Sequence, residues 1–235
     1  MPYQLNRIID QTMLRPNATR GELECFCEEA LYYNFICVAL LPNVIQEASF
    51  ILKGSQTHIM AAISYPRGMV PIDIKKKEIE EAINDGADEI DMVLNLEVVK
   101  NHKYKIIENE MTVLRESTGT LTAKAILETT LLSDEEIIQL CQLASDIGID
   151  FVKSSTGFNG NQASIHAIQL MKKSVFKKTQ VKAAGGISNL NKFLQMLKAG
   201  ATRIGTSAGP LIIEEYKTLG IDIDTMFKER KEKTL

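Results

Sequence analysis

The stretch NDGADEI, residues 84–90, closes an amphipathic segment at a glycine and passes at once into an apolar run. The same order returns in SDIGIDF at 145–151 and in KAGATRI at 198–204. Glycine ends helices readily because it adopts the left-handed conformation that closes the last turn, and a short apolar run after it indicates a strand. The three stretches therefore predict one repeated unit, in which a helix stops at Gly86, Gly148 or Gly200 and a strand begins.

Short apolar runs alternate with longer amphipathic segments along the rest of the chain as well. Two amphipathic segments open with capping boxes, Thr19 with Glu22 and Ser133 with Glu136. This alternation is typical of βαβ units and a parallel sheet. The predicted strands are residues 6–10, 35–40, 59–64, 88–94, 121–128, 149–154, 179–184 and 202–206.

No linker or change of composition interrupts these strand–helix units, which favours a closed barrel over an open doubly wound sheet. The length of 235 residues also suits such a barrel, since roughly 200–250 residues are usual for one domain of this kind. We therefore predict the α/β class and a single (β/α)8 TIM-barrel domain over residues 1–235. In this fold the chemistry sits at the carboxyl ends of the strands.

Composition excludes several classes of function. A net charge of −3 gives no reason to expect nucleic acid as a partner. No apolar run approaches the ~18–20 residues that span a bilayer, and the polar N-terminus does not resemble a signal peptide, so we expect a cytoplasmic protein without a membrane partner. Cys25 and Cys27 would lie on opposite faces of a helix, and the three histidines are scattered. We expect no metal site.

Three consecutive predicted strands each carry a lysine inside an otherwise apolar run: Lys124 in AKAIL, Lys153 in FVKSS and Lys182 in QVKAA. Neighbouring strands lie ~4.8 Å apart, so inward-pointing side chains would meet in one cavity. Desolvation and mutual repulsion would lower the pKa values there and make an amine nucleophilic. A single strand lysine is more often snorkelling or ion-paired, but three together favour a lysine-centred active site.

The strand at 88–94 offers an acid to these lysines. Asp91 shares strand parity with Glu89, and we expect one of the two acids to face the barrel interior. A carboxylate beside buried lysines is suited to proton transfer. Asp91 is therefore the predicted proton-transfer partner of the lysines.

Glycines and hydroxyl residues follow the last three predicted strands. In a (β/α)8 barrel, phosphate is usually bound by backbone amides of glycine-rich loops after strands seven and eight. Glycines at helix entrances are also often purely structural. The candidate phosphate-binding residues are Thr156, Gly157, Gly185, Gly186, Gly205 and Ser207.

Six motifs, in order and with their spacing kept from about residue 7 to 213, resemble the deoxyribose-phosphate aldolase family: IIDQTMLRP, DEIDMVLNL, AILETTLLSDEEI, FVKSSTGF, VKAAGGIS and TRIGTSAG. The resemblance implies a class I aldolase without cofactor or metal. Such an enzyme reversibly cleaves 2-deoxy-D-ribose 5-phosphate into acetaldehyde and D-glyceraldehyde 3-phosphate.

The resemblance also implies a role for each polar strand residue. Lys153 would form the Schiff base, Lys182 would lower the pKa of Lys153, and Asp91 would relay protons through water. The implied supporting network consists of Asp10, Thr12 and Lys124. The phosphate would bind at the glycines and at Ser207.

Departures from the family pattern fall around substrate contacts, at Gln11, Ala39, Arg67 and Ala208. They leave open a related Schiff-base aldolase with a different aldehyde acceptor. Two further alternatives are a barrel isomerase or synthase that uses Asp91 and Asp10 as acid and base, and a non-catalytic paralogue that binds a sugar phosphate. The implied partners are small sugar phosphates and aldehydes, together with further copies of the chain, because family members commonly associate.

Overall fold

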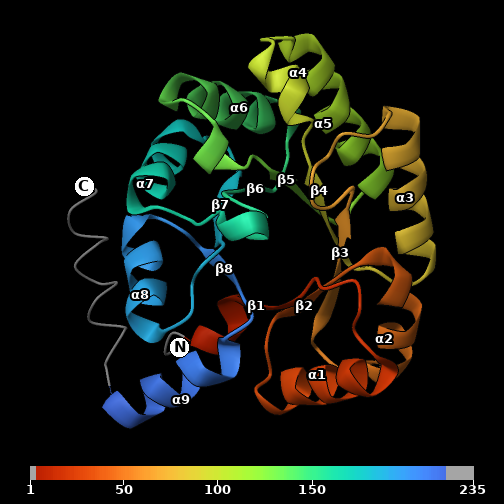
Figure 1. The fold of residues 1–235 in the computed structure, drawn as a ribbon, viewed down its shortest axis with the longest axis vertical. Coiled ribbons are helices and arrows are strands. Elements are labelled where there is room, and N and C mark those ends of the chain that lie inside the picture. The colour runs from red at the N-terminus through yellow and green to blue at the C-terminus, as the bar shows by residue number, and fades with distance from the viewer. Residues whose placement is uncertain (1–3, 221–235) are drawn as a thin grey trace.

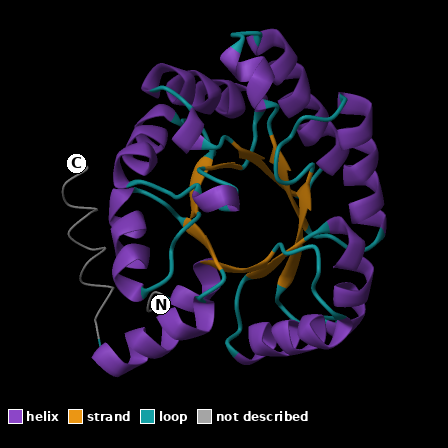
Figure 2. Ribbon diagram, in the orientation of Figure 1, coloured by secondary structure: helices purple, strands orange, loops and turns teal. Residues whose placement is uncertain are grey.

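The computed structural model describes residues 4–220, and within them eight parallel strands close into a barrel in chain order, from β1 to β8 (Figure 1). Helices surround this barrel on the outside (Figure 2). The predicted (β/α)8 fold is confirmed. The predicted domain of residues 1–235 also includes residues 1–3 and 221–235, which lie outside the described residues.

Each predicted strand is present, although the first begins three residues later than expected. The segment before it forms a 3-10 turn, η1 (Leu5–Ile8), in which the Asn6 amide donates to the carbonyl oxygens of Tyr33 and Asn34. These contacts hold the segment at the end of the first long helix instead of in the sheet. The strands are β1 Ile9–Met13, β2 Cys37–Leu40, β3 His58–Ile63, β4 Glu89–Val93, β5 Thr122–Ile126, β6 Phe151–Lys153, β7 Gln180–Ala184 and β8 Arg203–Thr206.

Helices connect successive strands, and the two predicted capping boxes open two of them, α1 and α6. The three predicted stop glycines have positive φ at the ends of α3, α6 and α8. The helices are α1 Arg20–Tyr32, α2 Ile45–Ile51, α3 Ile72–Asn84, α4 Leu96–Lys100, α5 Tyr104–Thr118, α6 Asp134–Ile147, α7 Ile165–Ser174, α8 Leu190–Ala199 and α9 Gly209–Leu219, with further 3-10 turns η2 Pro42–Val44, η3 Thr129–Leu131 and η4 Phe158–Gly160.

On α1, Cys25 is exposed and Cys27 is buried, in agreement with the predicted opposite faces. Among residues 4–220, no helix combines the length and apolar character that a membrane crossing requires.

The strands are buried on both faces. Their outward side chains pack against the helices in the main apolar core. Inside the barrel, the part lined by β2 and β3 is apolar, with Cys37, Ala39, Met60 and Ala62 in contact. The remaining strands send charged side chains inward, and buried charges are tolerated only when they are paired. The barrel interior is therefore divided into an apolar part and an ion-paired part, and the site lies in the second.

Candidate active site

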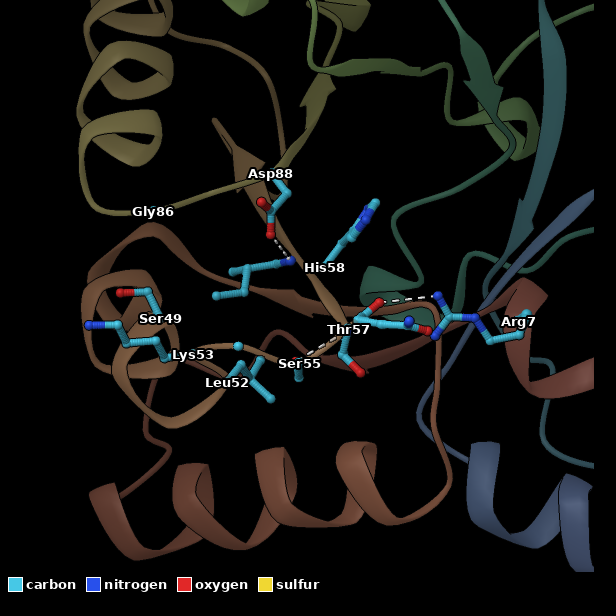
Figure 3. A pocket seen from close by; sticks show the side chains of 12 residues that line it. Arg7, Ser49, Leu52, Lys53, Ser55, Thr57, His58, Gly86 and Asp88 are labelled. Atoms are coloured by element: carbon cyan, nitrogen blue, oxygen red, sulfur yellow. Dashed lines mark hydrogen bonds between the residues drawn. The ribbon is translucent and has the colours of Figure 1, made fainter.

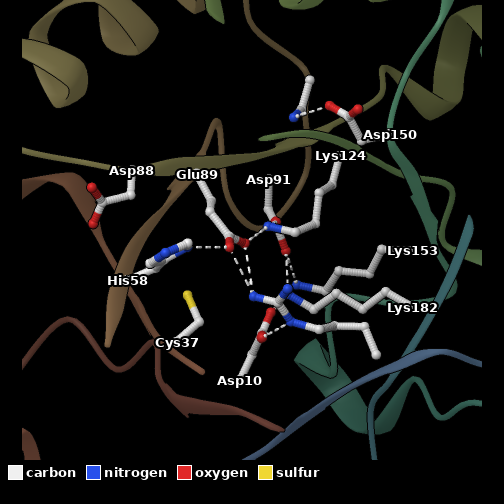
Figure 4. Close-up of polar contacts among 12 residues, drawn as sticks. Asp10, Cys37, His58, Asp88, Glu89, Asp91, Lys124, Asp150, Lys153 and Lys182 are labelled. Carbon is white, nitrogen blue, oxygen red and sulfur yellow. Dashed lines mark hydrogen bonds and ion pairs between the residues drawn. The ribbon is translucent and has the colours of Figure 1, made fainter. Parts of the chain in front are cut away.

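The three strand lysines point into the barrel and are almost completely buried (Figure 4). Cross-strand register places Lys153 directly beside Lys182. Lys124 instead lies beside Phe151, one layer lower, because the strands of a closed barrel are staggered. The lysines therefore lie together, but in two layers.

Asp91 lies at the centre of the three lysines. Its Oδ1 is 2.7 Å from the Lys124 Nζ, and its Oδ2 is 2.8 Å from the Lys182 Nζ and 3.1 Å from the Lys153 Nζ. Hydrogen bonds between charged groups of this kind are short and strong. One carboxylate is thus shared by three ammonium groups.

Three further charged side chains complete the cluster. The expectation that one of the two acids on β4 faces inward is wrong, since residues two apart on a strand share a face and Glu89 is buried beside Asp91. The Arg203 Nη2 donates to both oxygens of Glu89 at 2.9 Å. Asp10 contacts both Arg203 and Lys182. Charge balance explains why the second acid is tolerated inside the barrel.

Glu89 and Arg203 were missed as site residues in the sequence. Both carry the signal that identified the lysines, a charged side chain inside an apolar strand run. Glu89 was set aside in favour of Asp91, and Arg203 was read only as part of a strand. Glu89 is 1% exposed and Arg203 is 6% exposed, so both belong to the buried cluster.

The cluster balances its charge without Lys153. Three carboxylates face three cations that each contact at least one of them, so a proton on Lys153 adds a surplus positive charge. The carboxylates are those of Asp10, Glu89 and Asp91, and the cations are those of Lys124, Lys182 and Arg203.

This imbalance is reflected in the pKa of Lys153. Burial lowers the pKa most, Asp91 opposes the change, Lys182 reinforces it, and the resulting pKa is about 8. At pH 7 a lysine of ordinary pKa is neutral in roughly one molecule in a few thousand, whereas a pKa of about 8 makes it neutral in about one in ten. Lys153 is therefore equipped to act as a nucleophile.

The expectation of a lowered pKa is wrong for Lys124. Burial alone would lower the pKa of Lys124, but the carboxylates of Asp91 and Glu89 outweigh burial and raise it. Burial would also raise the pKa of Asp91, yet the ammonium groups around it, with Lys124 foremost, hold that pKa well below its usual range. Lys124 and Asp91 thus form a stable ion pair that supports Lys153.

A pocket of about 480 Å³ opens above Lys153 at the carboxyl ends of the strands. At Gly185 the φ of 99° and the 2.5 Å approach of the Asn161 carbonyl oxygen to the place of a Cβ both require glycine. At Gly205 a Cβ would lie 3.3 Å from the Lys182 Cε, so glycine leaves room for that side chain. The pocket lining includes all six predicted phosphate-site residues: Thr156, Gly157, Gly185, Gly186, Gly205 and Ser207.

Glu128 organises the loop between β6 and this pocket, and sequence reasoning assigned no role to this polar residue at a strand end. Its backbone is left-handed, with φ 60°, and its buried carboxylate accepts from the Ser155 Oγ at 2.5 Å and from the Thr156 N at 3.2 Å. The Thr156 hydroxyl also donates to it. The available signal was a carboxylate directly after an apolar strand; its partners could not be read from the sequence.

Residues on β1 lie on both sides of the sheet. Thr12 lines the pocket, and its hydroxyl donates to the Asp10 carbonyl oxygen at 3.0 Å. Gln11 points the other way, where its Oε1 accepts from the Gly209 N at 3.1 Å and its Nε2 donates to the Ser207 carbonyl oxygen at 3.4 Å. Gln11 therefore ties the loop after β8 to β1.

The other departures from the family pattern, at Ala39, Arg67 and Ala208, do not line the pocket of Lys153. Ala39 belongs to the apolar part of the barrel, and the Ala208 N donates to the Thr206 Oγ1. Arg67 is exposed and is not among the residues that line the pocket of Lys153. Arg15 does line it and pairs with Glu22 at 2.7 Å. Of these two arginines, Arg15 is the one placed to meet a substrate.

Asp10, Cys37 and Glu89 bring one potential ligand atom each to within 4.8 Å of one another. Both carboxylates are already paired with Arg203. Burial, reinforced by Glu89 and Asp10, raises the pKa of the Cys37 thiol well above its usual range, whereas a metal requires the thiolate. This donor set therefore does not suit a metal ion.

A (β/α)8 barrel with a buried amine of lowered pKa below an open pocket is the architecture of an enzyme that forms imines with carbonyl substrates. Residues 7–212 match the family model described as DeoC/LacD family aldolase. The chain belongs to this family and is an aldolase, as the motifs predicted.

Curated relatives and solved structures agree with the family match. The chain is similar to the deoxyribose-phosphate aldolase of Staphylococcus epidermidis, with 40% identity over 88% of this chain and 94% of the relative. It is similar to that of Caldanaerobacter subterraneus, with 41% identity over 92% and 94%. Among solved structures, a putative deoxyribose-phosphate aldolase from Coccidioides immitis superposes with a TM-score of 0.88 at 36% identity, covering 91% of this chain and 86% of that one.

Proposed function

We propose that the chain is a deoxyribose-phosphate aldolase, which reversibly cleaves 2-deoxy-D-ribose 5-phosphate into acetaldehyde and D-glyceraldehyde 3-phosphate through a Schiff base on Lys153. The observation that carries the proposal is the pKa of about 8 of Lys153, at the base of a glycine-lined pocket. The names of the similar curated proteins support the same substrate.

In the first step, the free amine of Lys153 attacks C1 of the open-chain sugar and forms a carbinolamine. The carbinolamine hydroxyl takes up a proton and leaves as water, so that a protonated imine remains. Lys182 and Asp91 are 2.8 Å apart, and Asp91 also contacts Lys153. We assign proton delivery to this pair, in which the Lys182 ammonium is the donor, Asp91 holds it in place and water carries the proton to the substrate.

In the second step, the C3 hydroxyl loses its proton and its oxygen becomes the carbonyl oxygen of glyceraldehyde 3-phosphate. The electrons of the C2–C3 bond move into the imine and produce an enamine. Protonation at C2 and hydrolysis then release acetaldehyde and restore the amine. A fixed positive charge on Lys153 is surplus to the balanced cluster, so the same electrostatics that favour the free amine favour the neutral enamine.

The phosphate of the substrate would bind on the glycine-lined side of the pocket. Backbone amides of Gly185 and Gly186 would be donors without a side chain in the way, whereas the Gly157 N already donates to the Ser155 Oγ at 3.3 Å. Ser207 adds a further polar group from the loop after β8. Arg15 is an exposed cation in the same lining. Backbone amides and one cation are enough to bind a single phosphate, so a cluster of lysines is not required.

The proposal includes the broader setting of the enzyme. Its partners would be small sugar phosphates and aldehydes, in one domain that spans residues 1–235. Free cysteines support the cytoplasm as its compartment. Association of copies is expected, since a similar deoxyribose phosphate aldolase, from Aeropyrum pernix, is described as tetrameric (27% identity, TM-score 0.82, covering 92% of each chain).

The test is borohydride reduction in the presence of deoxyribose 5-phosphate, followed by peptide mass spectrometry. We expect one stable adduct, on Lys153, together with release of glyceraldehyde 3-phosphate in a coupled assay. An adduct on Lys182, or no adduct, would contradict the assignment. Unphosphorylated deoxyribose, run in parallel, should react more slowly; equal rates would show that the phosphate does not contribute.

The alternative isomerase or synthase, with Asp91 and Asp10 as acid and base, is not favoured by the geometry. Both carboxylates are committed to ion pairs, and the pKa of Asp91 lies well below the range of a useful base. This alternative predicts appreciable turnover in Lys153→Leu. The non-catalytic paralogue predicts sugar-phosphate binding without glyceraldehyde 3-phosphate release.

A further inference from the structure

A second pocket lies on the amino-terminal face of the barrel, opposite the pocket of Lys153. It has a volume of about 580 Å³ and is formed by the start of β3 and the loops before β3 and β4 (Figure 3). His58, the first residue of β3, exposes half of its side chain. Its Nδ1 lies 2.9 Å from the Glu89 Oε1 (Figure 4). His58 therefore connects solvent on this face to the buried charge cluster.

Direct contacts continue from Glu89 to Lys153. The Lys124 Nζ lies 2.6 Å from the Glu89 Oε2 and 2.7 Å from the Asp91 Oδ1, and the Asp91 Oδ2 lies 3.1 Å from the Lys153 Nζ. These side chains are 0–3% exposed, and charges inside a protein are screened far less than charges in water. An unbroken line of buried contacts thus joins His58 to Lys153.

His58 and Lys153 also share a place in the charge balance. The three carboxylates of the cluster are matched by Lys124, Lys182 and Arg203, so a proton on either His58 or Lys153 is surplus. Two surplus protons on one buried cluster disfavour each other. The other charged or titratable groups around His58 are Asp88 before β4, Arg203 on β8, Cys37 beside it on β2, and Arg7 and Lys53 in the pocket wall.

We propose that His58 is a positioning residue for Lys153, acting through the buried ion pairs between them: a proton on His58 keeps part of Lys153 as the free amine at acidic pH. The hydrogen bond to Glu89 is the largest influence on His58 and raises its pKa, so His58 stays protonated closer to neutrality. By linkage, loss of the charge on Lys153 must also strengthen proton binding at His58. The proposal rests on the proposed role of Lys153 as the nucleophile.

The first test measures the linkage without any catalysis. The chain has three histidines, His58, His102 and His166, so their ring signals can be followed by NMR across a pH titration. In Lys153→Met the pKa of His58 should rise by on the order of half a unit relative to the wild type, because an effective dielectric of about 20 weakens but does not abolish such coupling. His102 and His166 should not change. An unchanged pKa of His58 in Lys153→Met would overturn the proposal even if the aldolase assay succeeds.

Reductive ethylation of Lys153 with acetaldehyde and borohydride is the matched control. It fills the same position but keeps an amine that can carry a charge, so the pKa of His58 should stay close to that of the wild type. A rise equal to that in Lys153→Met would show that steric change, not charge, moves His58, and would also overturn the proposal.

The second test is the pH profile of kcat/KM in His58→Gln. We expect a loss of about threefold near pH 6, equivalent to half a pKa unit at Lys153, and this loss should disappear as the pH rises and His58 gives up its proton in the wild type. Lys53→Gln is the control: Lys53 lines the same pocket and makes no ion pair among the described residues, so its profile should match the wild type. A loss of equal size at every pH would indicate a merely structural His58 and contradict the proposal.

Discussion

Two of the buried lysine–carboxylate contacts differ in kind, that of Lys75 with Glu110 between helices and that of Lys153 with Asp91 inside the barrel. The Lys75 Nζ donates to the Glu110 Oε1 at 3.0 Å and to the Val93 carbonyl oxygen at 2.8 Å. Burial lowers the pKa of both lysines. Burial with a lowered pKa is therefore not enough to define a nucleophile.

The two lysines differ in how their carboxylate partner is shared and in whether a substrate can reach the amine. Glu110 serves one lysine, whereas Asp91 is shared among three ammonium groups. Lys153 lines an open pocket, while Lys75, on α3, is 0% exposed and packs toward α5. A lysine with a carboxylate of its own holds two helices together; a lysine left over from a balanced cluster, below a pocket, is free to react.

The largest expected contrast is catalytic. Lys153→Met should reduce kcat/KM for deoxyribose 5-phosphate by at least about a thousandfold, because no other amine in the pocket replaces the nucleophile. Lys75→Met should retain the kcat of the wild type per folded molecule. Steady-state assays at matched folded concentrations check both. Comparable losses in the two variants would break the distinction between the two lysines.

The next contrast is in stability. Lys75→Met leaves Glu110 buried without its cation, and we expect the free energy of unfolding to fall by about 3 kcal/mol. Urea unfolding followed by circular dichroism measures the change. The double variant Lys75→Met/Glu110→Leu should recover most of the loss, since an apolar pair can replace a buried ion pair. No loss in the single variant would contradict a structural role for the pair.

Lys153→Met should change stability in the opposite direction at neutral pH. The folded pKa of about 8 lies below the ~10.4 of an unfolded lysine, so the unfolded state binds more protons between these values and the ammonium destabilises the fold below about pH 8. Asp91 keeps Lys124 and Lys182 as partners after the substitution. We expect a gain of about 1–3 kcal/mol at pH 7, which shrinks as the pH rises toward 10; a loss at pH 7 would count against the charge balance.

The smallest expected effect concerns the loop after β8. Gln11→Leu removes the contacts to Gly209, Ser207 and Glu29, and loss of the first two, which hold the loop, corresponds to a rise of about five- to tenfold in KM. The rise should affect deoxyribose 5-phosphate more than unphosphorylated deoxyribose, with kcat unchanged. Gln11→His, which restores a polar side chain, is the control. An equal effect on both sugars would show that the loop does not hold the phosphate.

Much of this organisation could be predicted from the sequence, because it depends on local signals. Stop glycines and capping boxes located the strand–helix units, and a charged residue in an apolar strand identified Lys124, Lys153 and Lys182. The pairing of charges could not be predicted, since it depends on the stagger that sets Lys124 beside Asp91 but Lys153 one layer higher. The pKa of Lys124 was misjudged for that reason.

Residues outside these local signals were missed. Glu128 acts through a left-handed turn that brings its carboxylate onto the loop after β6, and nothing in its sequence context specifies that turn. His58 stands at the start of a strand, where a polar residue is ordinary. Its importance follows only from the position of Glu89 beneath it.

Lys153 is reactive because the charge cluster has no carboxylate left for it alone. Competitive labelling tests this claim most directly: a brief pulse of acetic anhydride at each pH, with peptide mass spectrometry to measure acetylation at Lys153. We predict that labelling rises with pH and levels off with a midpoint at a pKa of about 8. A midpoint at about 10 or above, the value of an ordinary lysine, would contradict the account.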